Sequence, residues 1–497
     1  MTGATRLTVL IAPWVTLDSA HERLLSGLTL DSRHVQPGWL FLAVTGSSSH
    51  GLAYLDHALT NGAAAVLWEP DRGYDAEQVQ ARCQAAGAIA VPFEGLAAAA
   101  GELGGRFYDD PTSALRVIGV TGTDGKTSVA HYAAQLADQL DGPSAIMGTL
   151  GWGDVAAPID SELTTSDALT LQSRFAELRD RQVRTVAMEV SSHALAQHRT
   201  EAVRIDVAVL THVGRDHLDY HGTVEAYRAA KRQLFTRSGL SRCVLNLDDD
   251  LGAELLAAPD RRASALTYGY HAEADLRILS TTPQATSLRV KTLLNGIQRT
   301  LVLPVLGEFN AMNAMAALGA LVGDYPLDDA LNALDRIQPV PGRMEHYRTE
   351  NEALVVIDYA HTPGALEAAL STLRQHLSGR LICVMGCGGD RDRGKRELMG
   401  AAASRLADTV IITDDNPRTE DPAGIRAAVK AGCHPGSDCR EMDDREEAIA
   451  AAMAMARPGD GVLVAGKGHE SQQIIGEAVI PFSDQAVVRS RIPGGLA

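Results

Sequence analysis

The chain has 497 residues, and 45 lysines and arginines against 62 aspartates and glutamates leave a formal net charge of −17 at pH 7. So acidic a chain lacks the dense positive charge of a nucleic-acid-binding protein, and no apolar run approaches the roughly 20 residues that span a membrane. Six cysteines in so long a chain do not indicate a disulfide framework, and the first residues lack a signal-peptide pattern. We therefore expect a cytoplasmic enzyme.

Short β-branched runs alternate with Ala- and Leu-rich stretches along the chain, a pattern typical of α/β domains with largely parallel sheets. Two breaks interrupt the pattern, RFYDDPT at 106–112 and QPVPGR at 338–343, where prolines remove backbone donors. The breaks predict three domains, at 1–107, 108–340 and 341–497.

The first chemical motif, TGTDGKT at 121–127, follows an expected strand, Leu115–Val120, and precedes apolar residues at helical spacing. Glycines allow backbone N–H groups to face phosphates, and the start of a helix adds partial positive charge. Lys126 would reach the terminal phosphates and the Thr127 hydroxyl would bind Mg²⁺. The spacing differs from the longer Walker A motif, and a glycine turn that precedes a lysine by chance is the alternative.

Three later strands of the middle segment end in polar residues. Glu189 lies in TVAMEVSSHAL, Asp216 and His217 lie in GRDHLDYHG, and three aspartates end CVLNLDDD at 243–250. Ligands of open parallel sheets bind at the carboxyl ends of the strands, so we expect these groups near the phosphate loop, where they could complete Mg²⁺ coordination. A solvated loop and a zinc hydrolase are the alternatives for DHLDYH, although a zinc hydrolase has no use for a phosphate loop. The three aspartates are expected to be surface or cap residues.

These motifs resemble those of the Mur ligases. TGTDGKTS, MEVSSHAL, GRDHLDYHGTVEAYRAAK, GEFNAMNAMAAL, PVPGRME, DYAHTPGALE, GCGGDRDRGK, TDDNPRTEDP and AGKGHE occur in the order of that family, from LDSR at 30–33 almost to the C-terminus. The resemblance implies an α/β protein of three domains. A central P-loop-type parallel-sheet ATPase domain is flanked by an N-terminal α/β UDP-binding domain and a C-terminal Rossmann-like domain.

The resemblance also implies an activity, an ATP-dependent amide ligation in peptidoglycan synthesis. ATP converts a substrate carboxylate to an acyl phosphate, and an amine then displaces phosphate. The implied substrates are UDP-N-acetylmuramoyl-L-alanyl-D-glutamate and meso-diaminopimelate, and the implied cofactors are ATP, Mg²⁺ and a CO₂-derived carbamate on Lys231. We expect a monomer that neither binds nucleic acid nor inserts into a membrane.

Site residues follow from the resemblance position by position. One Mg²⁺ would be served by Thr127 and Glu189, and a second by His217 and carbamylated Lys231, with Lys126 beside them as a catalytic cation. The implied nucleotide contacts are Gly122, Thr123, Asp124, Gly125, Lys126, Thr127, Ser128, Asn310, Arg343 and Asp358. The implied uridine-binding region of the first domain contains Leu30, Ser32, Ser47, Ser48 and Ser49. The implied contacts to the UDP-muramoyl dipeptide are Thr164, Thr165, Ser191, Gln197 and Arg199. The implied diaminopimelate contacts are Arg391, Asp415, Asn416, Pro417, Arg418, Gly466 and Glu470.

In the family that the chain resembles, DNPR, at 415–418 here, accompanies meso-diaminopimelate, whereas lysine-adding relatives usually lack its arginine. Diaminopimelate has a second carboxylate where lysine has none, and a fixed arginine such as Arg418 binds a carboxylate bidentately. Beside lysine the same arginine would be unpaired, at a penalty of about 2–5 kcal/mol. The alternatives are a lysine-adding or folylpolyglutamate-type ligase, a nucleotide-binding module without turnover and, for DNPR alone, a plain Asn-Pro turn. Asp124 and His212 depart from the asparagines usual in the family.

Overall fold

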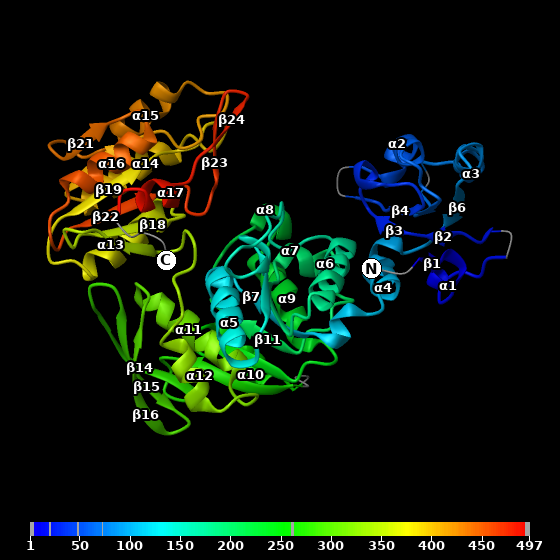
Figure 1. Ribbon diagram of the computed structural model, residues 1–497, viewed down its shortest axis with the longest axis horizontal. Coiled ribbons are helices and arrows are strands. Elements are labelled where there is room, and N and C mark those ends of the chain that lie inside the picture. Colours follow the sequence, from blue (N-terminus) through cyan, green and yellow to red (C-terminus); the bar gives the residue numbers. More distant parts are fainter. Residues whose placement is uncertain (1–3, 19–20, 47–48, 72, 260–262, 493–497) are drawn as a thin grey trace. The chain divides into compact units, whose positions relative to one another are not determined.

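The computed structural model describes residues 4–18, 21–46, 49–71, 73–259 and 263–492 (Figure 1). The chain forms two compact units, one of residues 1–126 and 137–266 and the other of residues 127–136 and 267–497. Both contain parallel strands that alternate with helices, which confirms the predicted α/β class. None of the described helices is long and apolar enough to cross a membrane.

The N-terminal part of the first unit is a four-stranded parallel sheet in the order β3-β4-β5-β6. Apolar side chains cover both of its faces, because each strand is a short, nearly continuous apolar run. Its elements are β1 (Thr5–Arg6), α1 (Leu7–Ile11), β2 (Leu24–Leu25), β3 (Gly27–Thr29), β4 (Trp39–Ala43), α2 (Leu55–Thr60), β5 (Ala65–Trp68), α3 (Ala76–Ala85), β6 (Ile89–Pro92) and α4 (Leu96–Phe107). Short 3-10 turns are η2 (Ser32–His34), η3 (Gly51–Tyr54) and η4 (Pro111–Ala114).

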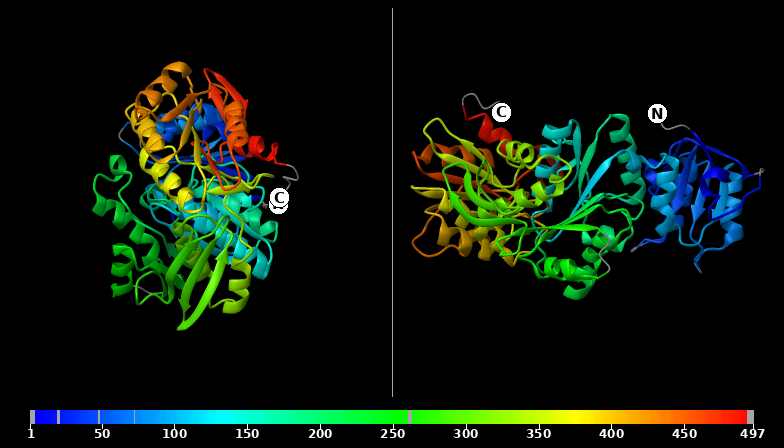
Figure 2. Two further views of the ribbon diagram at one scale, coloured as in Figure 1. Left: turned by 90° about the vertical axis from the view of Figure 1, so that its left-hand side faces the viewer. Right: turned by 90° about the horizontal axis from the view of Figure 1, so that it is seen from below.

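The rest of the first unit contains strands in the order β12-β11-β7-β10-β8-β9, parallel except for β9. The right-hand view of Figure 2 shows these strands side by side. The central strand β7 (Arg116–Thr121) starts and ends one residue later than the sequence predicted. Helix α5 (Lys126–Asp141) belongs to both units, because its residues 127–136 fall in the second. The other elements of the first unit are β8 (Ser144–Gly148), β9 (Gly151–Asp154), α6 (Ala168–Asp180), β10 (Thr185–Glu189), α7 (Ser192–Ala196), β11 (Val207–Leu210), α8 (Leu218–His221), α9 (Val224–Arg232), η5 (Gln233–Thr236), β12 (Arg242–Asn246) and α10 (Asp250–Ala257).

The second unit begins with an antiparallel group of strands. The boundary between the units falls within β13 (Ser264–Gly269), whose last two residues pair in parallel with β14, and β14, β15 and β16 follow as antiparallel neighbours. This part consists of β14 (Leu276–Pro283), β15 (Leu288–Leu294), β16 (Ile297–Leu303), α11 (Glu308–Leu321) and α12 (Leu327–Leu334).

A six-stranded sheet in the order β17-β18-β22-β19-β20-β21 forms the C-terminal part of the second unit. Apolar residues of α13, α14 and α15 pack on one face and those of α16 and α17 on the other. On the second side the fully buried Arg445 donates to both carboxylate oxygens of the equally buried Asp484. The elements are β17 (Glu345–Arg348), β18 (Leu354–Asp358), α13 (Pro363–Gln375), β19 (Leu381–Met385), α14 (Lys395–Leu406), β20 (Thr409–Ile412), α15 (Pro422–Ala431), β21 (Asp438–Glu441), α16 (Arg445–Met455), β22 (Gly461–Ala465), β23 (Gln472–Ile475), β24 (Ala478–Pro481) and α17 (Asp484–Arg489).

Candidate active site

The phosphate loop connects the end of β7 to the start of α5, as the sequence predicted. Gly122 has a φ of +153°, and a Cβ there would lie 1.8 Å from the hydroxyl oxygen of Thr211. That hydroxyl donates to the carbonyls of Thr121 and Asp124 and so ties the loop to the end of β11. A side chain at position 122 would therefore displace the loop.

Two positions at which the sequence departs from the family lie in or against this loop. The backbone N–H of Thr123 donates to the carbonyl of His212 over 2.6 Å, so residue 212 supports the loop through its backbone. The His212 ring instead faces Asp249, with Nδ1 3.2 Å from a carboxylate oxygen. Asp124 is exposed, and its backbone carbonyl accepts the Thr211 hydroxyl. Both changes thus leave the backbone framework of the loop intact.

Two lysines meet at one carbonyl of the loop. Lys126, at the start of α5, donates to the carbonyls of Gly122 (3.1 Å) and Thr123 (2.8 Å). Lys231, on α9, is 1% exposed and donates to the same Gly122 carbonyl over 2.6 Å. Burial, and after it the charge of Lys126, lowers the pKa of Lys231 from 10.5 to about 7. An amine with so low a pKa is partly neutral near pH 7, which is the form that reacts with CO₂.

Tyr227 is a residue of this site that the sequence analysis missed. It lies one turn before Lys231 on α9, and its ring centroid is 4.4 Å from the Lys231 Nζ. Its buried hydroxyl lies 2.8 Å from the Thr123 Oγ1, which also accepts the Gly214 N–H. The spacing of four residues in EAYRAAK was the available signal, because residues i and i+4 share one helix face.

Glu189 is the last residue of β10, the parallel neighbour of β7, and is 2% exposed. One carboxylate oxygen accepts the Thr149 N–H over 2.8 Å, and the other lies 3.3 Å from the Thr149 hydroxyl. Among the residues that the structure describes, the donors to this carboxylate belong to Thr149, and none is a charged group. A buried carboxylate without a counter-charge fits a site for a divalent cation.

His217 immediately precedes the short helix α8 and belongs to a group of aromatic and imidazole rings. Its ring centroid lies 4.7 Å from that of His193 and 6.3 Å from that of Tyr227, next to Lys231. Within the described ranges no three His, Cys, Asp or Glu side chains form a ready metal site. Mg²⁺ commonly takes one or two protein ligands and completes its shell with water and substrate phosphates, so scattered donors suit it better than zinc. Thr127 and Ser128, both expected at the nucleotide, are buried in the first turn of α5.

The residues expected at the muramoyl dipeptide form one connected group. The Thr165 hydroxyl donates to the Glu189 carbonyl (2.8 Å) and accepts the Ser191 N–H (3.1 Å). The guanidinium of Arg199 donates to the Thr165 carbonyl over 2.9 Å and to the side-chain oxygen of Gln197, and burial lowers its pKa. Thr164 joins the group, with its hydroxyl 3.1 Å from that of Thr149. These five residues therefore lead from Glu189 to a partly buried guanidinium suited to a substrate carboxylate.

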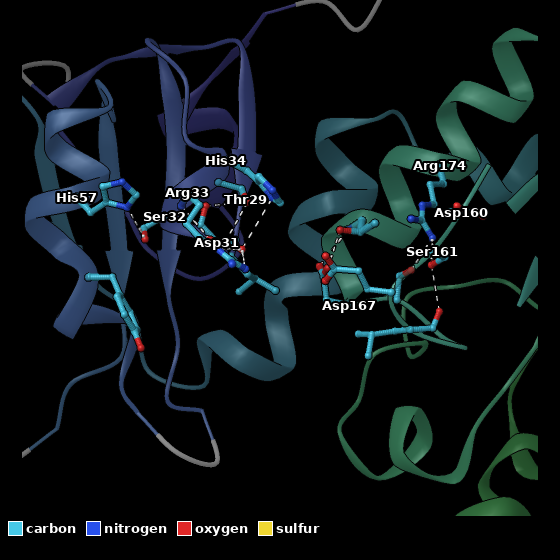
Figure 3. A pocket seen from close by; sticks show the side chains of 16 residues that line it. Thr29, Asp31, Ser32, Arg33, His34, His57, Asp160, Ser161, Asp167 and Arg174 are labelled. Carbon is cyan, nitrogen blue, oxygen red and sulfur yellow. Dashed lines mark hydrogen bonds and ion pairs between the residues drawn. The ribbon is translucent and has the colours of Figure 1, made fainter. Parts of the chain in front are cut away.

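Two of the residues expected at uridine line a pocket of about 810 Å³ in the first unit (Figure 3). Leu30 and Ser32 line it, and the Ser32 hydroxyl lies 3.2 Å from Nδ1 of His57, a lining residue that the sequence analysis missed. Ser49 is exposed, with its hydroxyl 3.4 Å from that of Tyr54 in the pocket wall. Ser47 and Ser48 lie outside the described residues.

Three further expected nucleotide contacts lie in the second unit. Asn310 is buried in α11, and its amide bonds to the Leu306 carbonyl and to Asn313. The guanidinium carbon of Arg343 lies 4.9 Å from the Tyr359 ring centroid, and its buried Nε has no partner among the described residues. Asp358 accepts the Met344 N–H over 2.8 Å, and burial raises the pKa of its carboxyl. An unsatisfied guanidinium N–H is a feature that an anionic ligand can satisfy.

The residues expected at diaminopimelate surround the loop after β20. Asp415 and Asn416 are buried there, and Arg418 donates to the Gly389 carbonyl over 2.9 Å. A Cβ at Gly388 would lie 2.8 Å from Nη1 of Arg418 and 3.8 Å from Cγ of the exposed Arg391, so both arginines flank this glycine. Gly466 and Glu470 follow β22 on the same side, and a Cβ at Gly466 would lie 2.6 Å from Asp415 Oδ2. The structure thus gathers this expected set, with Pro417 in the same loop.

Three family models match the chain. They are the Mur ligase family catalytic domain over residues 24–108, the Mur ligase middle domain over 120–321 and the Mur ligase glutamate ligase domain over 342–468. The fold and the site together define the class of this protein, a ligase built on a phosphate-binding parallel sheet. The chain belongs to the Mur ligase family.

Particular relatives carry more specific names. A UDP-N-acetylmuramoyl-L-alanyl-D-glutamate–2,6-diaminopimelate ligase of Alkalilimnicola ehrlichii is 45% identical over 488 residues, 97% of this chain and 98% of the relative. The enzyme of that name from Pseudomonas aeruginosa is 45% identical over 477 residues, 93% of this chain and 94% of its own. A solved structure of a ligase of the same name aligns with a TM-score of 0.72 at 35% identity and covers 99% of both chains. Folylpolyglutamate synthase of Mycobacterium tuberculosis, complexed with ADP and AMPPCP, shares the fold with a TM-score of 0.59 at 21% identity, over 74% of this chain and 92% of its own.

Proposed function

We propose that this chain is an ATP-dependent ligase that adds meso-diaminopimelate to UDP-N-acetylmuramoyl-L-alanyl-D-glutamate, forming UDP-MurNAc-tripeptide, ADP and phosphate. The observation that carries the proposal is the meeting of Lys126 and the buried Lys231 at the Gly122 carbonyl of the phosphate loop. A chain that had kept only the fold would have no reason to bury Lys231 against a peptide oxygen that the part-buried Lys126 already contacts, because burying charge is costly.

The residues of the loop would prepare the carboxylate for phosphorylation. Transfer of a phosphoryl group between two anions needs alignment and neutralisation of charge more than it needs a nucleophile of the protein. Lys126 and the N–H groups of 122–128 would neutralise the ATP phosphates, and Arg199 would hold the dipeptide near Glu189. Mg²⁺, when bound through Thr127 and Glu189 and through His217 and a carbamate on Lys231, would supply the remaining positive charge.

The loop after β20 would select the amino acid. Arg418 and Arg391 suit the distal carboxylate of diaminopimelate, and Glu470 suits an ammonium group. Asn310, Arg343 and Asp358 would be further nucleotide contacts. In this arrangement 1–107 would bind the UDP moiety, 108–340 ATP, and 341–497 the amino acid. We also propose that the chain acts as a monomer in the cytoplasm, where its nucleotide substrates are found.

The test is phosphate release with UDP-MurNAc-dipeptide, ATP and Mg²⁺, in which diaminopimelate is compared with lysine. We expect release with diaminopimelate and release with lysine slower by about 30-fold or more, the lower end of the cost of an unpaired arginine. Lys126→Met should abolish release with either amino acid. Equal rates for the two would refute the selectivity, and no release with either would favour a nucleotide-binding module without turnover.

A further inference from the structure

Lys467 is a fully buried cation of the C-terminal sheet to which neither the sequence analysis nor the proposed function gives a role. It follows β22 between two glycines with positive φ, +117° at Gly466 and +54° at Gly468. A Cβ at Gly468 would lie 2.7 Å from Cβ of Tyr359, just as one at Gly466 would collide with Asp415. Glycine on both sides therefore lets the backbone pass close to its neighbours while the lysine side chain is enclosed.

The Lys467 ammonium group contacts three residues of the expected diaminopimelate set. Its Nζ donates to Asn416 Oδ1 over 3.1 Å and to Glu470 Oε2 over 3.2 Å, and it lies 3.9 Å from Asp415 Oδ1. The Asn416 amide donates to the same Glu470 oxygen over 2.8 Å. The Asn416 Oδ1 also accepts the Ile474 N–H over 2.9 Å, so both ends of this amide are engaged.

These bonds leave Glu470 with one engaged and one available oxygen. In the described part of the chain no group donates a hydrogen bond to its Oε1, whereas Oε2 accepts from both Lys467 and Asn416. Without the ammonium group, the carboxylates of the buried Asp415 and the partly exposed Glu470 would face one another and an amide oxygen with no positive charge between them. Lys467 offsets the repulsion between these groups and holds Asn416 and Glu470 in one arrangement.

We propose that Lys467 is a positioning residue of the amino-acid site, which holds Asn416 and Glu470 so that the available oxygen of Glu470 receives an ammonium group of diaminopimelate. The inference rests on the proposed function, because it needs that substrate at this loop. Lys467 itself does not touch the substrate; it acts through the two residues it bonds.

The test is Lys467→Met in the full chain, with phosphate release measured while each substrate is varied in turn. We expect the KM for diaminopimelate to rise about 10- to 100-fold, the usual effect of losing hydrogen bonds to a charged group, while the KM for ATP and for the UDP substrate stays within about twofold. Lys430→Met is the matched control, because Lys430 is half exposed on α15 of the same domain and should leave all three values unchanged. An unchanged KM for diaminopimelate, or an equal rise of all three, would overturn the proposal.

A double-mutant cycle with Glu470→Gln separates positioning from general damage. If Lys467 acts through Glu470, the second substitution adds little to the first, whereas additive effects on KM would contradict the assignment. If Lys467→Met does not fold, Lys467→Gln repeats the test with a neutral donor at the same position, and failure of both to fold would mean that the residue is structural. No phosphate release by the unaltered chain would instead refute the proposed function, and calorimetric binding of diaminopimelate would then decide the role of Lys467.

Discussion

Replacement of the buried Lys231 by methionine should make the protein more stable while it removes the activity. Burial lowers the pKa of this lysine to about 7, whereas the unfolded chain has the ordinary value of 10.5. Between these values the unfolded state binds more protons than the folded state, so stability rises with pH through this window. The cost of keeping the lysine is therefore fully present below pH 7 and disappears near pH 10.5.

The size of the effect follows from the same two values. The difference between 10.5 and about 7 corresponds to an upper limit of about 5 kcal/mol at ~1.36 kcal/mol per pH unit. The Gly122 carbonyl would keep a partner in the variant, because Lys126 also donates to it. Because the unfolded state also changes, we expect about 2 kcal/mol of stabilisation. For a domain of some 200 residues this is a rise of about 4–8 °C in Tm.

Thermal denaturation of the unaltered chain and Lys231→Met at pH 6, 8 and 10 measures the difference in Tm between the two proteins. We expect the variant to have the higher Tm at pH 6 and the difference in Tm to disappear toward pH 10. Lys430→Met is the control and should show no such dependence on pH. Added bicarbonate should raise the Tm of the unaltered chain alone, because only it has an amine at position 231 that can become a carbamate. A variant that melts at or below the unaltered chain at pH 6 would refute the reasoning, as would a difference in Tm independent of pH.

Three other substitutions test separate parts of the account. Arg418→Ala should raise the KM for diaminopimelate at least about 30-fold, because a bidentate partner of a carboxylate is lost, and an unchanged value would show that Arg418 is not the contact. Glu189→Gln keeps an acceptor for Thr149 but removes the charge, so phosphate release should fall at least about 100-fold while Tm changes little; full activity would exclude this carboxylate from metal binding. Arg445→Met leaves Asp484 buried and unpaired, which should cost about 3–5 kcal/mol in urea denaturation, and a loss below 1 kcal/mol would contradict that estimate.

The local sequence was sufficient to predict the phosphate loop and the α/β class. Strand, glycine loop and helix are consecutive around Gly122, so neighbouring residues carry the whole signal, and the predicted strand was displaced from β7 by only one residue. Family resemblance supplied the rest of the site, from Leu30 to Glu470, and those roles remain predictions.

Contacts between distant segments could not be predicted in this way. The Tyr227 hydroxyl meets Thr123 across 104 positions, and Lys467 meets Asn416 across 51, so neither pairing leaves a local pattern. Asp249 shows the same limit. The three aspartates at 248–250 were expected to be surface or cap residues, and Asp249 does cap α10. It is not a surface residue, however, because it is 5% exposed and also accepts the Val213 N–H over 2.7 Å. Burial of a polar group depends on the strand that arrives beside it, which the residues next to Asp249 do not specify.

The shared peptide oxygen of Gly122 has a consequence for how a nucleotide would enter. An incoming triphosphate competes with two backbone carbonyls for Lys126. The free energy of nucleotide binding is therefore reduced by the cost of breaking these two hydrogen bonds. Once Lys126 turns to the phosphates, Lys231 becomes the remaining ammonium donor to that oxygen and loses the like charge beside it. Nucleotide entry would thereby change the electrostatic surroundings of a second lysine that the nucleotide need not touch.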